Sequence, residues 1–177
     1  LRASGSPDDI KQAKDVLEPV AIGAPSVDLA RAQLELARLY RELGDGAAKA
    51  LYTKVIAQTN SREIRVETAK YLIDFSDDNG GREMFDELLK GNVADPPELL
   101  VEAARAHLLV GDHAGGAELL DRADKAATKT WKYDRERGRL ALRKGDSNGA
   151  ALLLAKAREK SGDDIETLFL IAEVSSL

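Results

Sequence analysis

Cysteine is absent from the 177 residues, so disulfide bonds and thiolate chemistry are excluded, and a reducing or an oxidising compartment fits equally well. Aromatic residues make up only 5% of the chain, which suits closely packed helices better than a sheet sandwich. No apolar run reaches the length of about 18 residues that a membrane-spanning helix needs. We therefore expect no direct membrane insertion.

Patterns that would indicate catalysis or metal binding are missing as well. The two histidines, His107 and His113, have no third ligand nearby in sequence, whereas zinc sites need three or four ligands. Residues 44–46 read Gly-Asp-Gly, but no strand precedes them and no Gly-Lys-Ser/Thr follows, so they are not a phosphate loop. No Ser-His-Asp or Cys-His arrangement can be assembled. We expect no enzyme activity, no cofactor and no metal.

The overall charge is mildly acidic. The net charge is -5, so the chain has no general attraction for nucleic acid or for anionic membranes. Apolar residues make up 44% and charged residues 32%, which is typical of a folded chain rather than a disordered one. No nucleic-acid partner is expected.

A recurring dipeptide is the strongest positive signal. Gly111-Asp112 and Gly145-Asp146 lie 34 residues apart, and Gly44-Asp45 lies 67 residues before the first of these pairs. Each pair stands between two amphipathic segments. A fixed interval of this kind predicts an array of helical hairpins.

Alignment on the Gly-Asp turns reveals columns of similar residues. Two helices that pack about 8 to 10 Å apart need a small side chain where they cross, and a larger residue one turn further on fills the groove beside it. The small column of the first helices is Ala37, Ala69, Ala104, Gly138 and Ala172. The small column of the second helices is Ala13, Ala48, Gly81, Gly116 and Ala150, followed four residues later by Leu17, Tyr52, Phe85, Leu120 and Leu154. The alternative is an ordinary amphipathic bundle, which needs no such register.

These columns resemble the tetratricopeptide repeat, which has small residues at its eighth and twentieth places and larger ones at its eleventh and twenty-fourth. The resemblance implies an all-α, right-handed superhelical solenoid of antiparallel helix hairpins over residues 1–177. Its full repeats would be 30–61, 62–96, 97–130 and 131–164, with half repeats at 1–25 and 165–177. Asp134 and Arg137 depart from the pattern because they replace apolar residues, and Trp131 and Tyr133 are expected to fill that space.

The expected helices follow from the periodicity and from capping signals. Pro19 should kink or end the first helix, and Asp95 before two prolines is expected to cap the sixth. The predicted ranges are 7–20, 27–43, 46–58, 62–75, 80–90, 96–110, 113–127, 131–144, 147–160 and 164–176.

The resemblance also predicts where a ligand would bind, because the first helices of this family line a concave groove. One column of these helices is basic in all four full repeats, in a chain that is acidic overall; this basic column consists of Arg38, Lys70, Arg105 and Arg139. The candidate binding residues are Arg31, Leu34, Arg38, Arg41, Val66, Lys70, Ile73, Val101, Arg105, Leu108, Lys132, Arg135, Arg139, Leu142 and Phe169. The alternative is that the basic column only forms intrahelical pairs with acids three residues earlier, each worth about 0.2–0.5 kcal/mol; these acids are Glu35, Glu67, Glu102 and Glu136.

The functional hypothesis is a non-catalytic scaffold that binds a partner protein or peptide, either acidic or amphipathic, in this groove. A periplasmic module of a bacterial exopolysaccharide export complex, with an anionic polysaccharide as ligand, is one alternative, and a regulatory region of a larger enzyme is another. Leu34, Arg38 and Glu67 do not match the clamp that related proteins use for chaperone tails. The composition favours a bacterial protein, in the periplasm slightly over the cytoplasm. The uncapped C-terminal helix is a candidate surface for self-association.

Overall fold

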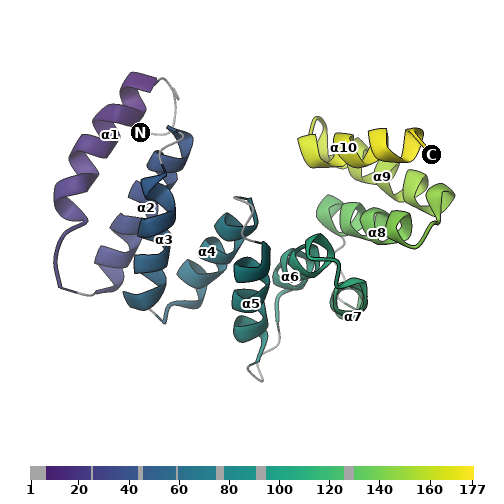
Figure 1. Ribbon diagram of the computed structural model, residues 1–177, viewed down its shortest axis with the longest axis horizontal. Coiled ribbons are helices and arrows are strands. Elements are labelled where there is room, and N and C mark those ends of the chain that lie inside the picture. Colours follow the sequence, from purple (N-terminus) through teal and green to yellow (C-terminus); the bar gives the residue numbers. More distant parts are fainter. Residues whose placement is uncertain are drawn as a thin grey trace. The chain divides into compact units, whose positions relative to one another are not determined.

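The computed structural model describes residues 7–24, 26–43, 46–58, 60–74, 78–90, 95–125 and 130–177, which form ten α-helices and no strand (Figure 1). The all-α fold class is confirmed. The helices are α1 (Pro7–Val20), α2 (Val27–Glu42), α3 (Ala47–Gln58), α4 (Arg62–Asp74), α5 (Asp78–Leu89), α6 (Pro97–Leu109), α7 (His113–Asp124), α8 (Trp131–Arg143), α9 (Ser147–Ser161) and α10 (Ile165–Ser175).

The chain divides into two compact units, residues 1–72 and residues 73–177. In the first unit α2 packs against α3 and α1 covers α2. In the second unit α6 pairs with α7 and α8 with α9, while α10 packs on α9 and α8 (Figure 1). Each unit is thus built from helix hairpins. The single continuous array and its repeat boundaries stay a prediction.

The observed helices match the predicted ones closely. The first helix ends at Val20, one residue after Pro19, which agrees with the prediction that Pro19 would kink or end it. The prediction that Asp95 caps α6 is wrong: the N-cap is Pro96, which makes no side-chain cap bond. Asp95 instead accepts a hydrogen bond of 2.9 Å from Arg122 Nη2 on α7, so its carboxylate joins two helices rather than ending one.

The Gly-Asp dipeptide has a local structural cause. Gly145 has a φ of 81°, a left-handed conformation that favours glycine and ends α8. The next residue, Asp146, caps α9 by accepting a 2.8 Å hydrogen bond from the backbone N–H of Gly149. Gly111 and Asp112 repeat this geometry between α6 and α7. The third predicted turn, at 44–45, lies outside the described residues.

Close approach of paired helices confirms the role of the small columns. A Cβ atom added to Gly138 would lie 2.7 Å from Leu154 Cγ, and one added to Gly116 would lie 2.7 Å from Leu108 Cδ2. Both distances are too short for a real contact, so glycine is what allows these backbones to draw together. The alanines of the two columns that are fully buried are Ala37, Ala48, Ala69, Ala104 and Ala150.

The departures from the repeat pattern in α8 are satisfied by polar contacts. Tyr133 is buried as predicted, and its hydroxyl accepts a hydrogen bond from Arg137 Nε and donates one to Asp124, both at 2.9 Å. Asp134 is buried too and receives a hydrogen bond from Lys160 Nζ at 3.1 Å. A charged pair between α8 and α9 therefore occupies part of the space expected for apolar groups.

Replacing Gly138 by valine tests the small columns. We expect the substitution to lower the free energy of unfolding by about 1–3 kcal/mol, because the new carbons overlap Leu154 in a filled core. Chemical denaturation followed by circular dichroism measures this change. The control is Ala155→Val on the exposed face of α9, where only the helix propensity of valine acts, at a cost of about 0.5 kcal/mol. Equal losses in the two variants would refute the close approach.

Candidate interaction site

Three of the predicted basic residues converge on one carboxylate in the second unit. Arg105 on α6 donates from Nε to both carboxylate oxygens of Glu166, at 3.1 Å each. Arg135 on α8 places Nη1 at 3.0 Å from the same carboxylate, and Arg139 contacts it through Nη2. Because Glu166 belongs to the first turn of α10, this cluster ties three helices together.

A second carboxylate, that of Glu136, binds two of these arginines. Glu136 is fully buried and accepts hydrogen bonds from Arg135 Nε at 2.7 Å and from Arg139 Nε at 2.8 Å. Both arginines are nearly fully buried as well. We call Arg105, Arg135, Arg139, Glu136 and Glu166 the ion-pair network.

The contacts within the network shift the pKa values of Glu166 and Arg105. Burial by itself would raise the pKa of Glu166, but the guanidinium groups of Arg135, Arg139 and Arg105 outweigh it and hold the pKa below its ordinary value. Burial would likewise lower the pKa of Arg105, yet the Glu166 carboxylate raises it overall. The carboxylate and the guanidinium groups are thus held in their charged forms.

Further ion pairs surround the network. Lys132 Nζ lies 2.5 Å from Glu102 on α6, and Arg143 lies 2.5 Å from Glu173 on α10. Arg135 also packs its guanidinium 5.2 Å from the centre of the Trp131 ring, close enough for a cation–π contact. The basic side chains of α8 are thus in contact with acidic residues of neighbouring helices or with residues of α8 itself.

The first unit shows the same behaviour on a smaller scale. Arg38 pairs with Glu35 on its own helix and, at 2.8 Å, with Glu67 on α4. Lys70 lies 3.5 Å from Glu67. Although burial opposes the effect, Arg38 and Lys70 lower the pKa of Glu67. Glu67 therefore links α2 to α4 through Arg38 and also pairs with Lys70 within α4.

The two interpretations of the basic column can now be compared with the observed contacts. The intrahelical pairs that the spacing predicted are present for Arg38, Lys70 and Arg139. Arg105 differs, because its partners are Asp74 and Glu166, and Glu102 pairs with Lys132 instead. The column is thus more than a ladder of exposed pairs within single helices.

The candidate binding residues fall into two groups by burial. Five apolar candidates are core residues and do not offer a surface to a ligand: Leu34, Ile73, Val101, Leu108 and Leu142. Arg135 and Arg139 are buried in the network. Two candidates are exposed, Arg31 and Phe169, the latter to 72%. The half-buried candidates are Arg38, Arg41, Val66, Lys70, Arg105 and Lys132.

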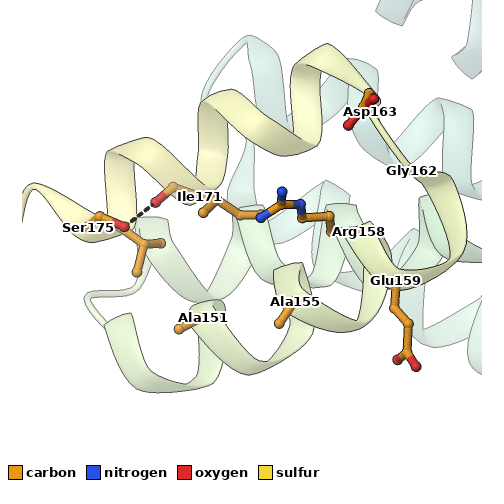
Figure 2. Close-up of a pocket in the computed structure, with 9 residues that line it drawn as sticks. Ala151, Ala155, Arg158, Glu159, Gly162, Asp163, Ile171 and Ser175 are labelled. Atoms are coloured by element: carbon orange, nitrogen blue, oxygen red, sulfur yellow. Dashed lines mark hydrogen bonds between the residues drawn. The ribbon is translucent and has the colours of Figure 1, made fainter.

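A groove between α9 and α10 was not predicted. It has a volume of 440 Å³, and its walls include Ala151 and Ala155 from α9 and Ile171 and Val174 from α10. Figure 2 shows the Arg158 side chain lying along the groove toward Ile171. The two exposed alanines four residues apart were the available sequence signal, but alanine is so common in this chain that the signal did not stand out.

Arg158 is the charged group of interest in this groove. Among the described residues it forms no ion pair, in contrast to the arginines of the network. Glu159 extends away from α10 in Figure 2. Glu159 and Asp163 also line the groove, but neither forms an ion pair with Arg158. The Arg158 guanidinium is therefore available to a carboxylate on a ligand that also contacts the apolar walls.

His107 is packed between helices and is 8% exposed. Its Nδ1 lies 2.7 Å from Asp112 and its Nε2 lies 2.9 Å from Asp86, so the ring joins α5, α6 and the cap of α7. No group of three or more potential metal ligands occurs in the part of the chain that the structure describes. Within the same ranges, no helix is both long and apolar enough to cross a bilayer.

No protein-family model and no curated protein matches the sequence. Solved structures do match. A tetratricopeptide repeat protein from Parabacteroides merdae has a TM-score of 0.69 at 16% identity, over 95% of this chain and 65% of that chain. MamA (41-end) from Desulfovibrio magneticus RS-1 has a TM-score of 0.60 at 16% identity, over 89% and 98% of the two chains. YrrB, described as a TPR protein with an unusual peptide-binding site, has a TM-score of 0.54 at 11% identity, over 98% and 84%.

The architecture of this chain is therefore that of tetratricopeptide repeat proteins, and the resemblance seen in the sequence columns is confirmed at the level of the fold. The chain spans 65% of the length of the Parabacteroides protein. At these identities the likeness concerns the fold and carries no partner or activity with it.

Replacing Glu166 by glutamine tests the ion-pair network. We expect the free energy of unfolding at pH 7 to fall by about 2–4 kcal/mol, because buried arginines lose their counter-charge. Urea unfolding measures this change. The control is Glu173→Gln on the same helix, whose pair with Arg143 is half exposed and is expected to contribute less than about 1 kcal/mol. A loss no greater than that of the control would contradict the network.

The same variant has a predicted pH dependence. Because the folded-state pKa of Glu166 lies below its unfolded value, the stability that Glu166 contributes is complete above about pH 4.5 and is lost as the pH falls through the lower folded-state pKa. Urea unfolding between about pH 6 and pH 3 should show a smaller acid-induced loss of stability in Glu166→Gln than in the wild type. Parallel curves would show that Glu166 does not contribute.

Proposed function

We propose that this chain is a non-catalytic scaffold for protein–protein interaction, and that the groove between α9 and α10 receives a peptide segment of the partner. The observation that carries the proposal is Arg158, which forms no ion pair among the described residues although Glu159 and Asp163 also line the groove. The proposed segment presents small apolar side chains to Ile171 and Val174 and a carboxylate to Arg158. The fold supports this proposal, because helix-hairpin arrays form extended surfaces suited to binding.

Exposed apolar side chains also occur elsewhere on the two helices that form the groove. Ile165 and Phe169 on α10 are each 72% exposed, and Leu152 on α9 is 75% exposed. None of the three lines the groove, so the proposal does not depend on them.

Other occupants and ligands have less support. Self-association through α10 would use the same exposed side chains, and sedimentation equilibrium of the purified chain distinguishes it from partner binding. The polysaccharide alternative depended on a column of free bases, whereas Arg38, Lys70, Arg105 and Arg139 all have acidic partners. No specific observation supports the alternative that this chain is a regulatory region of a larger enzyme.

Selection of peptides from a random displayed library against the purified chain tests the proposal. We expect the selected peptides to combine apolar residues with an aspartate or glutamate. Arg158→Glu should weaken their binding about tenfold or more, because it places like charges together. Isothermal titration calorimetry measures the affinity.

The matched control is Lys156→Glu, which makes the same charge change on the same helix at an exposed residue that does not line the groove. If both variants weaken binding equally, only the overall charge matters and the groove is not the site. Selected peptides without acidic residues would remove Arg158 from the proposal.

A further inference from the structure

The three guanidinium groups of the ion-pair network come from two helices, and the start of the third helix adds two carboxylates, because Arg135 Nη1 lies 3.1 Å from Asp164 as well as 3.0 Å from Glu166. Arg105 comes from α6, whereas Arg135, Arg139 and Glu136 come from α8. Glu166 comes from α10 and enters from the side. The geometry therefore separates a receptor, made of three guanidinium groups, from the carboxylate that occupies it.

The guanidinium groups are held in place by contacts that do not involve Glu166. Glu136 binds Arg135 and Arg139 through their Nε atoms at 2.7 and 2.8 Å. Asp74 accepts a 3.1 Å hydrogen bond from Arg105 Nη1. Because these partners would remain if Glu166 left, the three donor groups stay directed toward the same point.

The two central carboxylates differ in their access to solvent. The side chain of Glu136 is 0% exposed, whereas that of Glu166 is 26% exposed. Glu136 is thus a fixed part of the site. Glu166 lies at its open side, where an external carboxylate can approach without first unfolding α8.

The position of Glu166 near the start of α10 makes its exchange structurally simple. The buried side chains that anchor α10 are Thr167 and Leu170, while Ile165 and Phe169 on either side of Glu166 are exposed. A rotation of the Glu166 side chain into solvent therefore breaks its ion pairs without removing an apolar group from the core.

We infer that Arg105, Arg135 and Arg139 form a carboxylate-binding site that Glu166 occupies in the free chain and that a carboxylate of an acidic partner occupies by displacing it. This site is separate from the groove at Arg158. The inference deepens the proposed function by adding a second, self-occupied contact for an acidic partner. Glu166 acts as an internal competitor, so that only ligands with enough further contacts gain access.

Chemical rescue of the complete 177-residue chain tests this inference without any partner. Glu166→Ala removes the internal carboxylate and leaves its place open. Formate is the probe, with chloride at matched ionic strength and pH 7 as the reference. We expect formate at ten times its dissociation constant to raise the Tm of this variant by about 3–6 °C over chloride, as follows from ligand binding to the folded state. The wild type should show no difference between the two salts.

Two controls keep the result specific. Glu173→Ala on the same helix breaks an exposed pair with Arg143 and should show no preference for formate. If Glu166→Ala is unfolded at 20 °C, formate should restore its helical circular dichroism and chloride should not. In that case Glu166→Ser, which also leaves the place of the carboxylate open, provides a second measurement of the same salt preference.

If formate and chloride give the same Tm for both Glu166 variants, the inference is overturned, since Glu166 would then be a structural anchor only. A formate effect of equal size in Glu173→Ala would overturn it as well, because the effect would be a general property of the salt. Neither result bears on the groove, whose test depends on Arg158 and selected peptides. The two proposals therefore fail independently.

Discussion

Close contact between paired helices is the constraint on which the rest of this structure depends. Gly138 faces Leu154 across the α8–α9 pair, and Gly116 faces Leu108 across the α6–α7 pair, at distances that leave no room for a Cβ atom. This contact commits one face of each first helix to its own second helix. The opposite face of the first helix is free to contact the next hairpin. The basic column and its acidic partners lie on that face.

The charged columns serve as contacts between helices. A buried ion pair contributes little net stability, since desolvation offsets much of its Coulomb energy, but it discriminates strongly against arrangements that leave a charge unpaired. In the second unit Arg135 and Arg139 are buried with Glu136, so α6, α8 and α10 must keep the register that satisfies them. The network thereby defines the local geometry more than it raises the stability.

This arrangement changes what the basic column can do for a ligand. Because its arginines already have carboxylate partners, a ligand gains only the difference between its own contacts and those it replaces. The groove at Arg158 differs, since its guanidinium has no such partner to displace. The two proposed sites therefore differ in that the groove at Arg158 is open, whereas the place between Arg105, Arg135 and Arg139 is occupied by Glu166.

The sequence by itself determined the features that depend on a few neighbouring residues. Helix limits follow from apolar periodicity and from capping, and the Gly-Asp turns follow from the left-handed conformation of Gly145 and the cap formed by Asp146. The buried small columns were predictable for the same reason, because their spacing records which face of each helix meets its partner. Asp95 is an exception. Its position before α6 predicted a helix cap, but in the structure its carboxylate accepts a hydrogen bond from Arg122 on α7.

Only the tertiary structure decided which charges meet and which residues stay accessible. Glu166 and Arg105 are 61 residues apart, and no local pattern links them. Leu34 and Leu142 were predicted to face a ligand but are buried. The sequence pattern predicts which way a side chain points from its helix, but not how closely a neighbouring helix covers it. Long charged side chains reach several alternative partners, so their pairing depends on distances between helices that are set only when the hairpins pack together.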